Sequence, residues 1–308
     1  MINQKELPKI SIIICVKNSV KTIEKAIISL LSQNYPNLEF IVIDGCSNDG
    51  TIEVINRYKE FINKLIIEKD SGSAEANNKG IKNASSDIIG FLNADDFYES
   101  DILLKAGTEF SLNPNLDIVS FRYRVINENN DILKETTINE IAFNNDLPKC
   151  LGINAKFFKK SLFLKYGYVI ESDDKNRNLI SNDIEYMIRF KILGYEGKDI
   201  DWIGYNYMSH DNSLTFNNSF ENLIRLNEDM IFIAKIFINN QQLIKNNLLW
   251  KKIFIKWKIR HRYRIIILNF KLKKFDRMFK NLMIGFKENN KIKFFLYVVK
   301  RILKKKFY

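Results

Sequence analysis

The stretch ISIIICV, residues 10–16, decides the fold of this 308-residue chain. It is a continuous run of apolar, largely β-branched residues, as expected of a strand that is buried on both faces of a sheet. Apolar residues at helical spacing follow over residues 23–31, and a second buried strand is predicted over residues 40–43. This strand–helix–strand order indicates an α/β fold with a parallel sheet.

The alternation of strands and helices continues along the first half of the chain. We predict strands over residues 65–67 and 87–92 and a helix over residues 74–81 between them. Further along, residues 117–125 are typical of a strand and residues 182–193 of a helix. Ligands of such sheets bind beyond the carboxyl ends of the strands, so polar residues in those positions are candidate site residues.

Three polar clusters occupy such positions. They are Asp44 in IDGCSNDGT, Asp70 in EKDSG and residues 93–96 in FLNADD. Any one of them could be a simple turn, because Asp and Asn favour turns. Carboxylates that gather at one sheet edge repel one another unless a cation lies between them, so the three together predict a bound divalent metal. Oxygen ligands favour Mg²⁺ or Mn²⁺ over zinc.

These blocks resemble a known family. PKISIIICVKN, the IDGCSNDGT turn and DSGSAEANNKG followed by DIIGFLNADDFY are similar to the opening of family 2 glycosyltransferases, in the branch that builds bacterial surface polysaccharides. The resemblance covers roughly residues 8–215. It implies an α/β GT-A nucleotide-binding fold with a mixed, mainly parallel central sheet, followed here by a basic α-helical C-terminal extension.

The resemblance assigns donor-binding roles to several positions. Asp44 and Asp70 would contact the base or ribose of the nucleotide. Asn78, in the ANNKG segment with Gly80, would lie in a helix packed near the donor.

The same resemblance places the family's DXD motif at Asn93-Ala94-Asp95. Asp95 would bind the metal that bridges the donor diphosphate, and Asp96 would shape this shell or touch the donor sugar. Asn93 replaces the first Asp of a strict DXD motif. Ser73 and Ala74 are a second departure, because related sequences often have larger residues there. Both departures leave the identity of the donor sugar open.

A second carboxylate site is predicted in ISNDIEYMIRFKILGYEG, which places Asp183 and Glu185 at the start of a helix. An acceptor hydroxyl must lose its proton as it attacks, and a carboxylate within hydrogen-bond reach can accept it. The segment resembles the family's "ED" region, which implies that Asp183 is the catalytic base. The alternative is that these acids only stabilise the helix N-terminus.

His210 lies in YMSHDNSLT, which resembles the family's H-x-N-S element after the last core strand. The resemblance implies that it is close to the metal or diphosphate. The alternative is an ordinary surface or core histidine.

The activity implied is that of an inverting, metal-dependent glycosyltransferase of the hexosyltransferase type. It would move a sugar from a nucleotide-diphosphate sugar to a hydroxyl of a glycan or lipid-linked acceptor. The donor expected before others is a UDP-sugar. The product would be a surface glycan such as lipopolysaccharide, capsule or O-antigen. The sugar, the acceptor, the linkage and the oligomeric state are not fixed by the sequence.

Charge divides the chain into two parts. Residues 1–220 contain 25 basic and 31 acidic side chains, and residues 221–308 contain 23 basic and 5 acidic ones. We therefore predict a catalytic domain over 1–220 and a basic helical region over 221–308. Trp250, Phe254 and Trp257 share one helical face with lysines beside it, which predicts contact with an anionic membrane surface. The alternative is a helix that packs on the rest of the protein.

The three cysteines show neither zinc spacing nor a disulfide pattern, and no signal or membrane-spanning segment is recognised. We expect a cytoplasmic protein, with a peripheral place on the inner face of the cytoplasmic membrane as a further option. Three rival hypotheses stay open: a nucleic-acid-binding protein that uses the basic tail, an inactive scaffold with the same fold, and a sugar nucleotidyltransferase. No nucleic acid is expected as a partner, because no recognised motif for it occurs.

Overall fold

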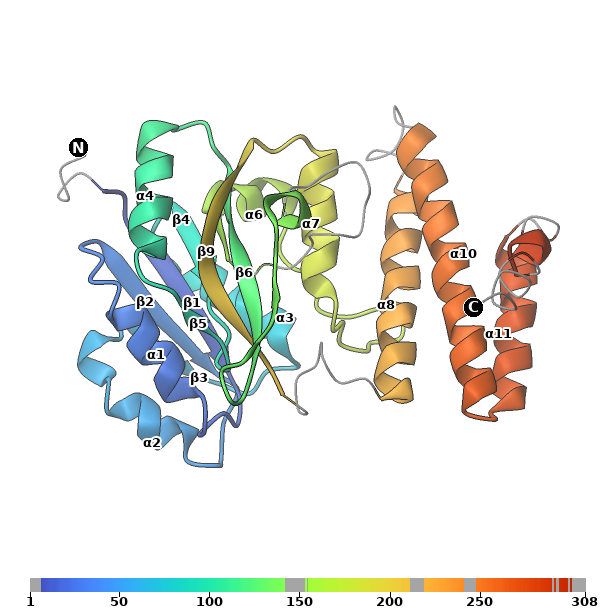
Figure 1. Ribbon diagram of the computed structural model, residues 1–308, viewed down its shortest axis with the longest axis horizontal. Helices are drawn as coiled ribbons and strands as arrows, with labels where there is room; N and C mark the ends of the chain where they lie inside the picture. The colour runs from blue at the N-terminus through green and yellow to red at the C-terminus, as the bar shows by residue number, and fades with distance from the viewer. Residues whose placement is uncertain are drawn as a thin grey trace. The chain divides into compact units, whose positions relative to one another are not determined.

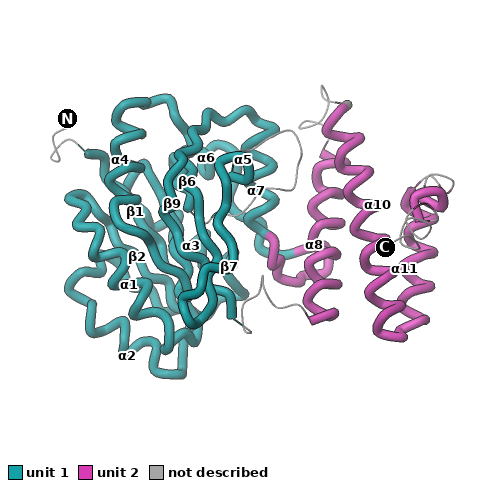
Figure 2. The backbone as a smooth tube through the Cα atoms, viewed as in Figure 1, with its two compact units in different colours: residues 1–172, 182–213 teal, residues 173–181, 214–308 magenta. Residues whose placement is uncertain are grey.

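The computed structural model of the chain describes residues 7–141, 153, 155–210, 219–240, 248–289, 291, 294–298 and 300. The chain forms two compact units (Figure 2). Unit 1 contains residues 1–172 and 182–213, and unit 2 contains residues 173–181 and 214–308. The division into a catalytic domain over 1–220 and a membrane-associated region over 221–308 stays a prediction. Two compact units do not by themselves show which part is catalytic or which part contacts a membrane.

Unit 1 is built on one mixed sheet (Figure 1). Its order is β3-β2-β1-β4-β8-β6-β9-β5, and β7 pairs with β6. The strands are β1 Ile10–Val16, β2 Leu38–Asp44, β3 Lys64–Ile67, β4 Ile88–Phe91, β5 Phe97–Tyr98, β6 Ile118–Asn127, β7 Ile132–Glu135, β8 Lys156–Lys159 and β9 Gly197–Ser209. Strands β3, β2, β1 and β4 pair in parallel with one another in this order, and β6 pairs in parallel with β9. The mixed α/β sheet predicted from the sequence is thus confirmed.

The helices of unit 1 cover this sheet from both faces. They are α1 Ile23–Leu31, α2 Thr51–Asn56, the short η2 Lys59–Phe61, α3 Ser73–Asn83, α4 Ile102–Leu112, α5 Ile138–Ile141, α6 Lys160–Tyr166 and α7 Asn182–Ile192. Alternate residues of β1 point to opposite faces. Ile12 and Ile14 join a core with α1 and α4, while Ile13 faces α3.

The close contact between α3 and β1 explains one glycine. A Cβ atom at Gly80 would lie 2.4 Å from Cγ2 of Ile13, far inside van der Waals contact. Gly80 therefore lets α3 approach the strand closely, and this brings the N-terminal end of α3 to the carboxyl edge of the sheet.

Unit 2 contains three longer helices, α8 Phe220–Asn239, α10 Leu248–Lys271 and α11 Phe275–Glu288. The rings of Phe237 on α8 and Phe254 on α10 stack with centroids 4.8 Å apart. Trp250 and Trp257 pack on the same Phe254 ring at 5.9 and 6.1 Å. The helical C-terminal region predicted from the sequence is confirmed.

This packing corrects one part of the membrane prediction. Trp250, Phe254 and Trp257 are between 0% and 9% exposed, so the face predicted to meet lipid is instead the core of unit 2. An amphipathic pattern reports which face of a helix is buried but not whether protein or lipid buries it. Within the described part of the chain, no helix combines the length and apolarity needed to cross a membrane.

Candidate active site

Two predicted donor-binding residues lie at, or just beyond, the carboxyl ends of neighbouring strands. Asp44 is the last residue of β2, and its carboxylate accepts hydrogen bonds from the backbone N–H and the hydroxyl of Ser47, at 2.8 and 2.6 Å. Its side chain is buried and holds the turn after β2 in place. Asp70 follows β3, which is paired in parallel with β2. Both carboxylates thus lie at the same sheet edge, as predicted.

Asp70 lies directly against the β2 turn. A Cβ atom at Gly45 would be only 2.7 Å from Oδ2 of Asp70, so glycine provides the space that this carboxylate occupies. Burial raises the pKa of Asp70, and the nearby Lys17 ammonium opposes this effect. Lys17, directly after β1, was not singled out from the sequence. Its position after a strand at the same edge is the signal that could have found it.

The two candidate metal ligands, Asp95 and His210, lie side by side. Nε2 of His210 lies 2.9 Å from Oδ2 of Asp95, and both side chains are partly exposed. Asp95 follows β4 and His210 directly follows β9, so two distant strands bring the pair together. The structure thus places in contact the two residues predicted as metal ligands.

Asp96 points away from solvent and holds the Asp95 segment in place. Its carboxylate accepts hydrogen bonds from the Tyr205 hydroxyl, the Met208 backbone N–H and the Asn93 amide, each at 2.8 Å. Burial and the neighbouring Asp95 charge raise the pKa of Asp96 well above its usual value, despite these three donors. Of its two predicted roles, shaping the metal shell fits this geometry. Tyr205 was missed by sequence reasoning, because nothing local marks it.

Asn78 and Asn93 both use their side chains within the chain. The Asn78 amide donates to the Val169 carbonyl and to the Glu171 carboxylate, and its oxygen accepts from the Val169 N–H. Asn78 therefore ties α3 to residues 169–171. Direct contact of Asn78 or Asn93 with a donor stays a prediction.

The predicted base, Asp183, lies in the first turn of α7 and is half-buried. Burial raises the pKa of Asp183 to about 6, against the opposing backbone N–H groups of Ile184 and Ile153. A carboxylate with this pKa is largely ionised at neutral pH yet more basic than an ordinary aspartate.

Its neighbour Glu185 is occupied elsewhere. Glu185 and Arg189 form a buried ion pair at 2.8 Å, and Arg189 also donates to the backbone carbonyls of residues 166–168. Of the two acids at the start of α7, Asp183 is the one left able to accept a proton.

A direct contact links the segment that carries the predicted base to the loop that carries Asp70. The Asn182 side-chain amide donates to Oγ of Ser73 at 3.2 Å. Ser73 begins α3, three residues after Asp70, so this bond joins the start of α7 to the loop that carries Asp70. Sequence reasoning did not foresee it, because 109 positions separate the two residues.

No group of three or more His, Cys, Asp or Glu side chains gathers as a metal site within the described residues. Asp95 and His210 nevertheless offer an oxygen and a nitrogen ligand side by side. This pair fits an ion such as Mn²⁺ that fills its remaining positions with oxygen atoms of a ligand and water.

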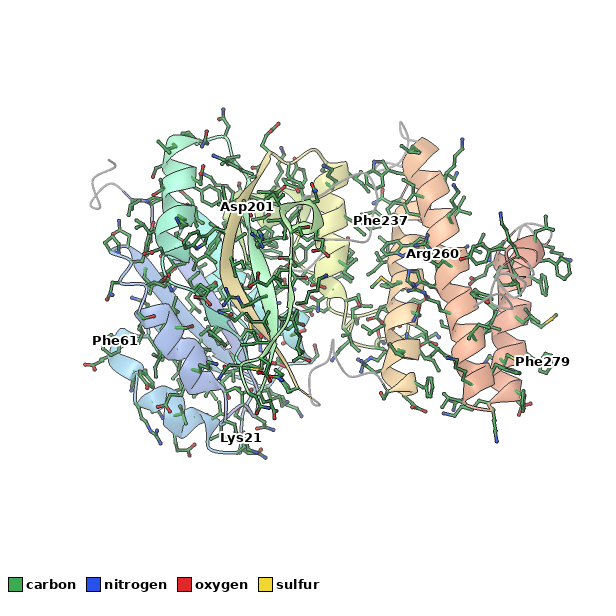
Figure 3. All side chains as sticks on the ribbon, in the orientation of Figure 1. Lys21, Phe61, Asp201, Phe237, Arg260 and Phe279 are labelled. Carbon is green, nitrogen blue, oxygen red and sulfur yellow. The ribbon has the colours of Figure 1, made fainter. Side chains whose placement is uncertain are left out.

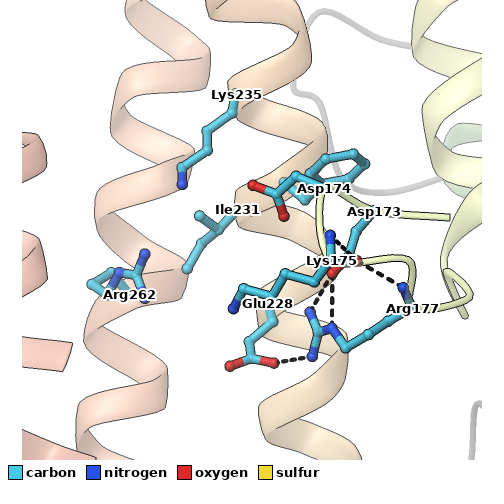
Figure 4. Close-up of a pocket in the computed structure, with 9 residues that line it drawn as sticks. Asp173, Asp174, Lys175, Arg177, Glu228, Ile231, Lys235 and Arg262 are labelled. Atoms are coloured by element: carbon cyan, nitrogen blue, oxygen red, sulfur yellow. Dashed lines mark hydrogen bonds and ion pairs between the residues drawn. The ribbon is translucent and has the colours of Figure 1, made fainter. Parts of the chain in front are cut away.

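A separate open pocket lies in unit 2 (Figure 4). Its wall is rich in charged side chains, among which Arg177 pairs with Asp173 at 2.6 Å and with Glu228 at 2.5 Å. These pairs tie the 173–181 segment to α8. None of the predicted site residues lines this pocket.

Comparison with known proteins identifies the class. A parallel sheet with acidic residues beyond its strand ends is typical of nucleotide-binding enzymes. The family described as glycosyl transferase family 2 matches residues 11–171, which is just over half of the chain. The chain belongs to this family.

Individual relatives agree with this assignment. The chain is 36% identical over 101 residues to a putative teichuronic acid biosynthesis glycosyltransferase, TuaG, of Bacillus subtilis (strain 168). The match covers 32% of this chain and only 40% of that relative.

Two solved structures share the fold. The structure of S. aureus TarS 1–349 in complex with UDP-GlcNAc has a TM-score of 0.61 at 17% identity, over 89% of this chain and 79% of the other. The mannosyltransferase PcManGT of Pyrobaculum calidifontis, in complex with GDP-Man and Mn²⁺, has a TM-score of 0.57 at 16% identity, over 98% and 81%. The GT-A fold expected from the sequence is thus confirmed.

Proposed function

We propose that this chain transfers a sugar from a nucleotide-diphosphate sugar, with a UDP-sugar as the first choice, to a hydroxyl of a bacterial surface glycan or its lipid-linked precursor. The observation that carries the proposal is the contact between Asp95 and His210, at the sheet edge that also holds Asp44 and Asp70. Support comes from family membership and from the UDP-GlcNAc in the TarS complex. The nucleic-acid-binding and nucleotidyltransferase hypotheses gain no support from the family.

The donor would lie along the edge formed by the ends of β1 to β4. Asp44 and Asp70 would face the nucleoside, and Lys17 lies close enough to Asp70 to affect its pKa and could neutralise a phosphate. Carboxylate oxygens accept hydrogen bonds, so these two side chains suit the hydroxyl and N–H groups of a ribose and base.

Asp95 and His210 would hold a divalent cation, Mn²⁺ or Mg²⁺. A cation there supplies charge neutralisation for the leaving diphosphate. The chain's own part is to keep the two ligands in place: Asp96, fixed by Tyr205 and Met208, holds the Asp95 segment against β9, which ends at His210. The Mn²⁺ in the PcManGT complex supports this assignment.

Asp183 would remove the proton from the acceptor hydroxyl as that oxygen attacks the anomeric carbon. A single displacement of this kind inverts the anomeric centre. The raised pKa of Asp183 suits a base that works near neutral pH. The bond between Asn182 and Ser73 would keep this base at a fixed position relative to the donor loop.

The test is a transfer assay with a panel of nucleotide sugars and metal ions. Donors that bind are first selected by the rise in melting temperature that they cause, since binding to the folded state stabilises it by mass action. We expect one uridine-diphosphate sugar to be turned over with Mn²⁺ or Mg²⁺ and the rate to vanish in EDTA. Full activity in EDTA, or no donor binding by any nucleotide sugar, would overturn the proposal; binding without turnover would favour the inactive scaffold.

A further inference from the structure

Helix α11 is apolar on more of its surface than its packing requires. Met278, Leu282 and Phe286 pack inward against the cluster that includes the fully buried Phe294. Gly285 marks the tightest point, because a Cβ there would lie 2.2 Å from the Phe294 ring. This inner face accounts for the attachment of α11 within unit 2.

The adjacent outer face is also apolar, but it is exposed. Phe275, Phe279 and Met283 recur every four residues and are 48%, 57% and 66% exposed. Phe270, 56% exposed at the end of α10, extends the patch, with its ring centroid 6.1 Å from that of Phe275. Figure 3 shows Phe279 projecting away from α10. We call these four residues the α11 patch.

The surroundings of the α11 patch are strongly basic. Lys271, Lys273, Lys280 and Lys287 are all exposed. The acidic side chains between residues 270 and 289 are Asp276 and Glu288, and Glu288 is paired with Lys235 and Arg262. An anionic partner therefore meets four lysines and one exposed carboxylate.

We propose that the α11 patch docks on the surface of an anionic lipid bilayer. Exposed aromatic and Met side chains insert into the boundary between headgroups and acyl chains, while lysines beside them are attracted to anionic lipids. A nucleic acid would match the lysines but leave the apolar side chains without a function. A two-fold contact between copies of this chain would bring the lysines face to face, which is repulsive.

The α11 patch takes the place of the Trp250 face as the candidate membrane-binding surface, because the Trp250 face is buried and the α11 patch is exposed. The proposal does not depend on the transfer reaction, because lipid binding is measured without donor or acceptor. Since all four patch residues are exposed, replacing them leaves the core of unit 2 intact.

The experiment is co-sedimentation of the full chain with vesicles of phosphatidylcholine alone or with 30% phosphatidylglycerol. The test variant combines Phe275→Ser, Phe279→Ser and Met283→Ser. The matched control combines Leu112→Ser and Leu164→Ser, which are 62% and 61% exposed in unit 1. A second variant combines Lys280→Gln and Lys287→Gln, and circular dichroism checks that every variant is folded.

We expect the wild type and the control to bind the anionic vesicles, with binding weakened by salt. The triple variant should bind on the order of tenfold less, and the lysine variant several-fold less. Equal binding by the triple variant and the wild type would overturn the proposal, as would no binding of the wild type to anionic vesicles. A dimer of the wild type that the triple variant converts to a monomer, without a change in lipid binding, would assign the patch to self-association instead.

Discussion

Nε2 of His210 and Oδ2 of Asp95 lie 2.9 Å apart, although 115 positions separate these residues in the sequence. Strand β9 delivers the histidine and the segment after β4 delivers the aspartate. Asp96 secures the arrangement, since it accepts hydrogen bonds from β9 through Tyr205 and Met208. The candidate metal pair is therefore a product of the sheet topology and not of a local motif.

Replacing Asp183 with Asn should lower kcat by about 10²–10⁴-fold, because an amide cannot accept the acceptor proton. The KM for the donor should stay within a factor of about two, because the donor loop is untouched. Steady-state kinetics with the selected donor measure both. Glu60→Gln, at an exposed carboxylate of η2, is the control and should behave as wild type. Near-wild-type turnover by Asp183→Asn would remove this residue from the mechanism.

The rate should depend on pH through Asp183. Burial raises the pKa of this carboxyl to about 6, and the base works only when ionised. Below pH 6, kcat should therefore fall about tenfold per pH unit, and above pH 7 it should level off. The residual rate of Asp183→Asn should lack this inflection. An inflection that persists unchanged in the variant would assign the titration to another group.

Replacing Gly45 with Ala should weaken donor binding. The new Cβ would lie 2.7 Å from Oδ2 of Asp70, so that carboxylate must move. We expect the Kd for the donor nucleotide, measured by calorimetry, to rise roughly three- to tenfold, or about 0.7–1.4 kcal/mol. Cys46→Ala, at the next and exposed position, is the control. Unchanged affinity in Gly45→Ala would show that the position of Asp70 does not matter for the donor.

The buried Glu185–Arg189 pair should matter far more for stability than an exposed pair. Arg189→Met leaves the buried Glu185 carboxylate and the carbonyls of residues 166–168 without their donor. The free energy of unfolding should therefore fall by about 3–5 kcal/mol. Arg57→Met breaks the exposed pair with Glu24 and should cost less than about 1 kcal/mol. Urea denaturation compares the two. Similar losses in both variants would contradict the structural role given to Arg189.

Local pattern was sufficient to predict the parallel half of the sheet. The ISIIICV run and the later strand segments are apolar and rich in β-branched residues, because helices cover both faces of the sheet. Such continuous apolar runs are typical of parallel strands. The remaining strands were harder. Within β9, residues 197–203 are mostly exposed and polar, and β5 has two residues, so neither has a periodicity to detect.

The site was predicted unevenly for a related reason. Asp44 ends a strand, and Asp70 and Asp95 each come shortly after one, so their common edge follows from the alternation alone. The contact of His210 with Asp95 and the bond of Asn182 to Ser73 depend on pairings across 115 and 109 positions, which no local pattern encodes. His210 was identified only through resemblance to the family. The Trp250 face was misassigned because the pattern of an apolar helical face is the same against protein and against lipid.

The most direct measurement is the binding of UDP to the wild type and to Asp95→Asn, by isothermal titration with and without Mn²⁺. If Asp95 and His210 hold the cation that meets the diphosphate, Mn²⁺ should tighten UDP binding to the wild type by tenfold or more, about 1.4 kcal/mol. It should have little effect on Asp95→Asn. UDP binding that is independent of Mn²⁺ in the wild type, or equally enhanced in both proteins, would contradict the account.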